Sequence, residues 1–123
     1  MFQTPLQIPT PAWRDDEELN IFNDSVGQFM ARECVPHLED WRAAGIVPRD
    51  MWNKAGEMGL LCPSIPEEYG GLGMGFVSTM LTCEYISSGN GSLSTAFGAH
   101  TGIGTMPITL YGTEEQKKKY VTK

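Results

Sequence analysis

Long apolar runs are missing from this 123-residue sequence. A helix that crosses a membrane needs about twenty mostly apolar residues, and no such stretch occurs. Cations are scarce as well: nine lysines and arginines stand against fifteen aspartates and glutamates, for a formal net charge of −6 at pH 7. Nucleic-acid binding depends on clustered cations, and the one basic run, at 117–119, comes shortly after two glutamates at 114 and 115. The sequence therefore predicts neither a membrane span nor a nucleic-acid partner.

Cysteine is rare and has no regular spacing. The three cysteines, Cys34, Cys62 and Cys83, form an odd and scattered set. Such a set is typical of reduced thiols in a cytoplasm or an organelle matrix rather than of a disulfide framework. The first residues lack the basic and apolar segments of a secretory signal. We expect a soluble protein in the cytoplasm, or in the mitochondrial matrix if the source is eukaryotic.

Residue groups with catalytic or metal-binding spacing are also missing. A C-x-x-H pair occupies 34–37, but a metal site needs three or four converging ligands, and His100 is the only other histidine. Cys62 has no histidine near it in the sequence, and no G-x-S-x-G nucleophile motif occurs. The adjacent carboxylates of Glu67 and Glu68 are expected to diverge on a solvated turn. The sequence predicts no metal site and assigns no catalytic group.

The segment Ser64–Gly75 is rich in glycine and proline. These residues disfavour a regular helix or strand and predict a shaped loop between two helices. A dinucleotide-binding G-x-G-x-x-G fingerprint fails here, because Phe76 stands where the last glycine is required. The acidic residues Glu67 and Glu68 would also repel a pyrophosphate. We therefore expect a structural connector and no phosphate cradle.

Apolar residues recur at helical spacing through the rest of the chain, and no segment alternates as a strand would. After an extended arm over residues 1–12, the cap and turn signals place helix starts near Asp15 (paired with Glu18), His37, Pro48, Phe76, Ser92 and Thr113 (in a capping box with Gln116). Pro107 is expected to end or bend the fifth helix. The predicted fold is all-α, an orthogonal or up-down bundle of five to six helices. The last helix stops two residues after Val121, which is typical of a truncation inside a larger protein.

The fifth predicted helix contains two glycines one turn apart, Gly98 and Gly102. Glycine costs about 1 kcal/mol relative to alanine at each helical position, so an offsetting contact is expected. In one interpretation another helix packs closely against these glycines. In the other, the helix forms one wall of a narrow pocket into which Ala99, His100 and Ile103 reach. The periodicity leaves both interpretations open.

Four groups of residues occur in a particular order: Pro66–Gly73, Glu84, Ser92–Leu93 with His100, and Tyr111–Tyr120. Their order and spacing resemble the N-terminal helical domain of the flavin-dependent acyl-CoA dehydrogenases. The likeness runs from about Glu17 to the last residue, and we expect residues 13–123 to form such a domain. In complete members a β-domain and a C-terminal four-helix domain follow, and neither is present in this chain.

The resemblance implies α,β-desaturation of acyl-CoA thioesters in fatty acid metabolism, in which a carboxylate removes the α-proton and the β-hydride passes to FAD. It also implies a homo-oligomer, an electron-transfer flavoprotein as acceptor, and a catalytic base and most FAD contacts in the later domains. This chain is then not catalytic alone. Ala99, His100 and Ile103 fall in the stretch that lines the deep end of the acyl slot in relatives. In one interpretation His100 shortens that slot or accommodates a modified acyl group. In the other, its side chain points away from the slot and only packs.

Two other interpretations stay open. The first is an acyl-CoA oxidase or a flavin monooxygenase of the same fold. These enzymes differ from the dehydrogenases in how the reduced flavin reacts with oxygen. The second is a free-standing helical interaction module, whose exposed apolar face would bind a partner protein.

Overall fold

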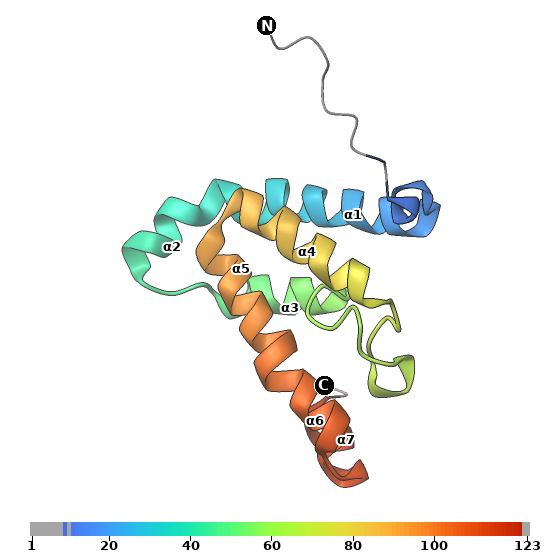
Figure 1. Cartoon of the computed structure of the whole chain (residues 1–123). Coiled ribbons are helices and arrows are strands. Elements are labelled where there is room, and N and C mark those ends of the chain that lie inside the picture. The colour runs from blue at the N-terminus through green and yellow to red at the C-terminus, as the bar shows by residue number, and fades with distance from the viewer. Residues whose placement is uncertain (1–8, 10, 122–123) are drawn as a thin grey trace, which may run out of the picture.

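The computed structural model describes residue 9 and residues 11–121, and every regular element in this part of the chain is a helix (Figure 1). The all-α prediction is therefore confirmed. Most of the arm predicted over residues 1–12 lies outside the described residues. The elements in chain order are η1 (Ala12–Asp15), α1 (Glu17–Phe29), η2 (Met30–Cys34), η3 (Val35–His37), α2 (Leu38–Ala44), α3 (Arg49–Glu57), η4 (Glu67–Tyr69), α4 (Phe76–Gly89), α5 (Gly91–Gly98), η5 (Ala99–Thr105), α6 (Met106–Tyr111) and α7 (Glu114–Tyr120).

Helix α1 has an acidic cap, one residue later than predicted. The Leu19 amide donates to Asp16 Oδ1 at 3.1 Å, whereas Asp15 belongs to the short 3-10 helix η1. The prediction of Asp15 as the cap was wrong, because two adjacent aspartates give the same local signal. The helix continues through the π-helical segment η2, and Pro36 then lies in the 3-10 turn η3. Within the described residues no helix is long and apolar enough to cross a membrane.

Helices α5 and α6 are joined by the π-helical segment η5 into one continuous rod (Figure 1). Its N-cap is Asn90, whose side chain accepts a hydrogen bond from the Leu93 amide at 2.9 Å, so the prediction of Ser92 as the cap was wrong. Pro107 does not end the rod. It is the second residue of α6 and directly follows the π-helical segment η5, so the rod continues through it.

The core lies where α1, α3, α4 and α5 meet (Figure 1). Helix α4 packs against α1 and α5. The rings of Trp52 and Phe97 meet at the edge of this core with their centroids 5.1 Å apart. Burial of one large aliphatic or aromatic side chain contributes roughly 1.5–3 kcal/mol, so this cluster supplies much of the folding free energy. Its buried members are Val26, Phe29, Met30, Cys34, Met51, Ala55, Leu60, Ile86, Leu93 and Phe97.

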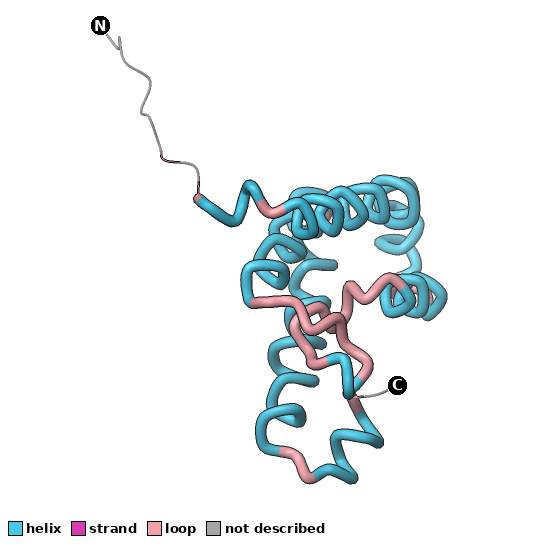
Figure 2. Tube along the Cα trace, turned by 90° about the vertical axis from the view of Figure 1, so that its right-hand side faces the viewer, coloured by secondary structure: helices cyan, strands magenta, loops and turns pink. Residues whose placement is uncertain are grey.

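The connector between α3 and α4 holds a definite shape, as its composition predicts (Figure 2). The Gly73 amide donates to Ile65 O at 2.8 Å, and the Met74 amide donates to Pro63 O at 2.9 Å. Gly73 has φ +64°, a conformation that favours glycine, and a β-carbon at Gly71 would lie 2.0 Å from Ile65 O. Ile65 and Pro63 are fully buried, so the connector is part of the packed structure.

The last helix, α7, begins with the predicted capping box, in which Thr113 and Gln116 exchange side-chain and backbone hydrogen bonds. It is also attached to the connector. Tyr69 Oη donates to Glu114 Oε2 at 3.1 Å, and Lys117 Nζ lies 5.4 Å from the centre of the Tyr69 ring. Lys117 also pairs with Glu114 at 3.0 Å. The first and last of the four residue groups therefore contact each other in the fold.

Candidate functional site

An apolar cavity of about 350 Å³ lies between α4, the α5–η5 rod and the connector. Its buried residues Leu60, Pro63 and Phe97 form the floor, while Phe76 at the rim is 74% exposed. The cavity therefore opens to the protein surface. The described residues that line it are Leu60, Pro63, Ser64, Phe76, Thr79, Thr82, Cys83, Phe97, Gly98, Thr101, Gly102 and Met106.

Both glycines of the fifth predicted helix line this cavity. Apart from the adjacent residues and the backbone of the same helix, no atom lies within 4 Å of a β-carbon placed on Gly98 or on Gly102, so no second helix in the described chain packs closely against them. Gly98 has ordinary helical angles, with φ −62° and ψ −39°, so its backbone does not require glycine. Within the described residues the two glycines border open space, as a pocket wall would.

The hydroxyl groups around the cavity do not make it polar. The Thr82 hydroxyl donates to a carbonyl one turn earlier at 2.8 Å, and the Thr101 hydroxyl donates to Leu61 O at 2.5 Å. The oxygens of Ser64 and Thr79 are covered by surrounding atoms and have no hydrogen-bond partner. Among the described lining residues only Cys83 is ionisable. This cavity is suited to a hydrocarbon group and offers no acid or base for catalysis.

The three residues predicted from the resemblance lie elsewhere on the rod. Ala99, His100 and Ile103 are exposed, Ile103 to 78%, and none of them lines the cavity. His100 lies beside the connector, with Nε2 4.0 Å from Cys62 Sγ. Neighbouring positions on a helix point in different directions, so the side that bears Gly98 is not the side that bears Ala99. Their role at an acyl slot stays a prediction.

A small polar cluster surrounds Cys62. Besides the contact with His100, Thr105 lies next to it, and the Thr105 hydroxyl donates to His100 O at 2.9 Å. Burial raises the pKa of the Cys62 thiol and outweighs the opposing effect of a hydrogen bond with Thr105. The thiol therefore stays protonated and is a poor nucleophile. No local sequence pattern indicates this pair, because 38 positions separate its two residues.

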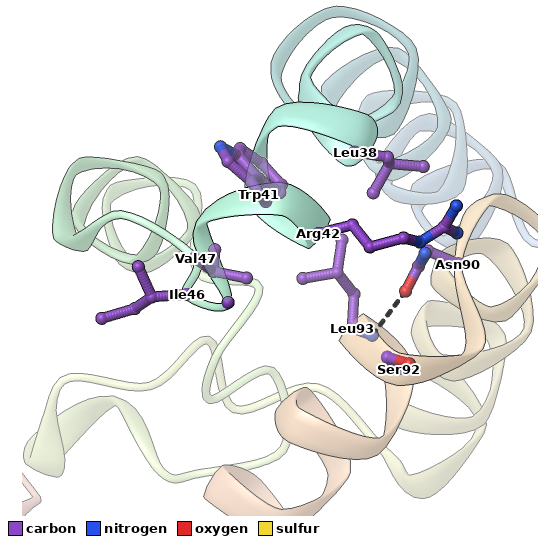
Figure 3. Close-up of a pocket in the computed structure, with 9 residues that line it drawn as sticks. Leu38, Trp41, Arg42, Ile46, Val47, Asn90, Ser92 and Leu93 are labelled. Carbon is purple, nitrogen blue, oxygen red and sulfur yellow. Dashed lines mark hydrogen bonds between the residues drawn. The ribbon is translucent and has the colours of Figure 1, made fainter.

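A second pocket, of about 300 Å³, lies between α2 and the start of α5 (Figure 3). Leu38, Trp41 and Leu93 contribute apolar surface to it, and Figure 3 shows Arg42 extending toward Asn90. Two polar groups of this pocket already have partners. Arg42 pairs with a glutamate three residues earlier at 2.7 Å, and the Asn90 oxygen caps α5.

The glycine-rich connector does not fit a dinucleotide phosphate. A phosphate cradle needs free backbone amides that point at the ligand. Here the amides of residues 69–74 donate to carbonyl groups within the connector itself. Glu67 and Glu68 also place negative charge beside it. The connector therefore presents no free run of amides to a pyrophosphate.

Comparison with known proteins places the chain in a family. Residues 16–123 match the family model of the acyl-CoA dehydrogenase N-terminal domain. A probable acyl-CoA dehydrogenase of Bacillus subtilis strain 168 is 40% identical over 116 residues, which is 94% of this chain and 19% of that protein.

Solved structures agree with this match. The crystal structure of an acyl-CoA dehydrogenase from Geobacillus kaustophilus is 37% identical with a TM-score of 0.81, and the match covers 97% of this chain and 29% of that one. An acyl-CoA dehydrogenase from Bacillus anthracis, solved in complex with FAD, is 36% identical with a TM-score of 0.77. This match covers 97% of this chain and 19% of that one. The chain thus spans less than a third of the length of these relatives. It belongs to the acyl-CoA dehydrogenase family and corresponds to the N-terminal domain of its members.

Proposed function

We propose that this chain is the part of a flavin-dependent acyl-CoA dehydrogenase that holds the hydrocarbon tail of the substrate. The whole enzyme would desaturate acyl-CoA thioesters between the α and β carbons. The observation that carries the proposal is the apolar cavity of about 350 Å³ between α4 and the α5–η5 rod. Each methylene group buried there gains about 0.8 kcal/mol, so a cavity of this kind favours an acyl chain.

The remaining chemistry is assigned to parts of the enzyme outside this chain. We propose that they supply FAD binding and the catalytic base, because the described cavity offers neither. Ile103, Leu110, Tyr111 and Tyr120 are exposed apolar side chains, and we propose that those parts cover them. We also propose that the whole enzyme is a homo-oligomer in the cytoplasm or the mitochondrial matrix. It would pass its electrons to an electron-transfer flavoprotein.

Ala99, His100 and Ile103 are proposed as further contacts of the acyl group. They are exposed on another side of the same rod, so they would contact a part of the substrate that extends beyond the cavity. In the full-length enzyme we expect His100→Ala to shift the preferred acyl chain length upward, because it removes polar bulk. An unchanged chain-length profile would contradict this role.

The central test uses the full-length enzyme and a series of straight-chain acyl-CoA thioesters from butyryl to palmitoyl. We expect anaerobic bleaching of the flavin absorbance, with affinity that rises about fourfold per methylene until the cavity is filled. Acetyl-CoA, which has no tail to bury, is the control. No flavin reduction by any thioester, or an affinity independent of tail length, would refute the proposal.

The same assay separates the alternatives. Rapid reoxidation of the reduced flavin by air would favour an oxidase or a monooxygenase of this fold. A soluble complex with another protein, in the absence of any flavin chemistry, would favour an interaction module.

A further inference from the structure

We propose that a small cavity between η1, α1 and α4 binds a zwitterion, an α-amino acid with an apolar side chain. The cavity has a volume of about 250 Å³. Sites for drug-sized ligands have roughly 300–1,000 Å³, so this one is suited to a smaller molecule. It is separate from the acyl cavity, and the inference does not depend on the proposed function.

Helix α4 separates the two cavities. Leu81, Glu84 and Tyr85 line the small one, and their spacing of three and four residues places them on one face of α4. The residues that α4 contributes to the acyl cavity lie at other positions, on the opposite face of the helix. A ligand in the small cavity would therefore not meet the acyl chain.

Two side chains of opposite charge line the small cavity, and neither forms an ion pair with a described residue. Arg14, in η1, contacts the ring of Trp13, with Cζ 5.6 Å from the ring centre. Glu84, in α4, has no hydrogen bond within the part of the chain that the structure describes. A guanidinium group binds a carboxylate, and a carboxylate binds an ammonium group. The two charges therefore match the two charged groups of an amino acid.

A buried amide without a partner is the second observation that points to a polar ligand. Asn23, in α1, lines the cavity and is only 6% exposed, yet its Oδ1 atom has no hydrogen-bond partner among the described residues. Such an atom costs free energy, which a ligand that donates to it would recover. A half-turn of the amide exchanges its oxygen and nitrogen, so Asn23 can accept from an ammonium group or donate to a carboxylate.

The rest of the lining is apolar and held in place. The ring of Tyr85 lies 3.6 Å from a β-carbon placed on Gly27, so it packs against α1. The Asn20 side chain donates to Arg14 O at 2.9 Å and attaches η1 to α1. Leu81 adds buried aliphatic surface. An apolar ligand side chain would contact these groups, and an aromatic one could also stack on a ring.

The test is isothermal titration calorimetry of the full-length enzyme with L-phenylalanine. Two analogues each lack one charge: 2-phenylethylamine has no carboxylate, and 3-phenylpropanoate has no ammonium group. We expect saturable binding of L-phenylalanine and about tenfold weaker binding of each analogue, because a hydrogen bond to a charged group is lost in each case.

Variants then test the lining residues. Arg14→Gln and Glu84→Gln should each weaken L-phenylalanine binding about tenfold. Asp24→Asn and Arg32→Gln are the matched controls, because both residues are exposed charges outside the cavity, and they should leave the affinity unchanged. Asn23→Leu should abolish binding but keep or raise the melting temperature of the ligand-free protein, since it removes a buried oxygen that has no partner.

The absence of saturable L-phenylalanine binding would overturn the inference. Equal binding of either analogue would overturn it as well, because the site would then recognise a single charge. Unchanged affinity in the Arg14 and Glu84 variants would show that the ligand binds elsewhere. Flavin reduction by acyl-CoA tests the proposed function separately, so either proposal can fail alone.

Discussion

Replacing Gly71 with alanine should destabilise the protein sharply, because the connector packs backbone against backbone there. The new β-carbon would lie 2.0 Å from Ile65 O and 2.5 Å from Ile65 C, so the two backbone segments of the connector must separate by about 1 Å. That movement breaks the Gly73–Ile65 hydrogen bond, which is 2.8 Å long, at a cost of about 1 kcal/mol. It also displaces the fully buried Ile65 side chain, whose burial contributes roughly 1.5–3 kcal/mol. We expect a loss of about 2–4 kcal/mol.

Urea denaturation measures this loss. With a slope of about 2 kcal/mol per molar urea, the midpoint should fall by roughly 1–2 M. Gly75→Ala is the matched control, because Gly75 lies in the same connector and has no atom within 4 Å of its β-carbon position. Its stability should stay within about 0.5 kcal/mol of the wild type. Equal midpoints for the Gly71 and Gly75 variants would refute the packing argument.

Three further predictions concern other contacts. Tyr69→Phe removes the donor to Glu114, so amide hydrogen exchange in α7 should quicken, and unchanged exchange would show that this contact does not hold the helix. Thr101→Val leaves Leu61 O without its donor and should cost about 1 kcal/mol in urea denaturation, whereas Thr101→Ser should restore most of it. Burial raises the pKa of Cys34 from 9.0 to about 11, so the folded state keeps a proton that the unfolded state releases. Stability should therefore fall as the pH rises from 9 toward 11, and Cys34→Ala should flatten that slope.

Much of the fold could be predicted from the sequence because its signals are local. The capping box of Thr113 and Gln116 specifies the start of α7 within four residues. Gly45, with φ +70°, ends α2 in the left-handed conformation that glycine adopts readily. The errors were also local. Asp16 and Asn90 are the N-caps in place of the residues predicted nearby. Several residues near each helix start can accept the same hydrogen bond, and the sequence does not show which of them is best placed.

The cavity could not be predicted because its walls come from distant parts of the chain. Leu60, Thr79 and Met106 meet only after α3, α4 and the rod have packed. The glycine pair at positions 98 and 102 indicated either close helix packing or a pocket wall, and the periodicity favoured packing. Spacing alone also did not show that the side of the rod that bears His100 is separate from the cavity.

The most direct test of the account is a structure of the full-length enzyme with a substrate-analogue acyl-CoA bound. We predict that the acyl carbons lie within about 4 Å of Phe97, Gly98 and Met106, in the cavity between α4 and the rod. An acyl chain bound elsewhere, with this cavity filled by side chains from another part of the enzyme, would contradict the account.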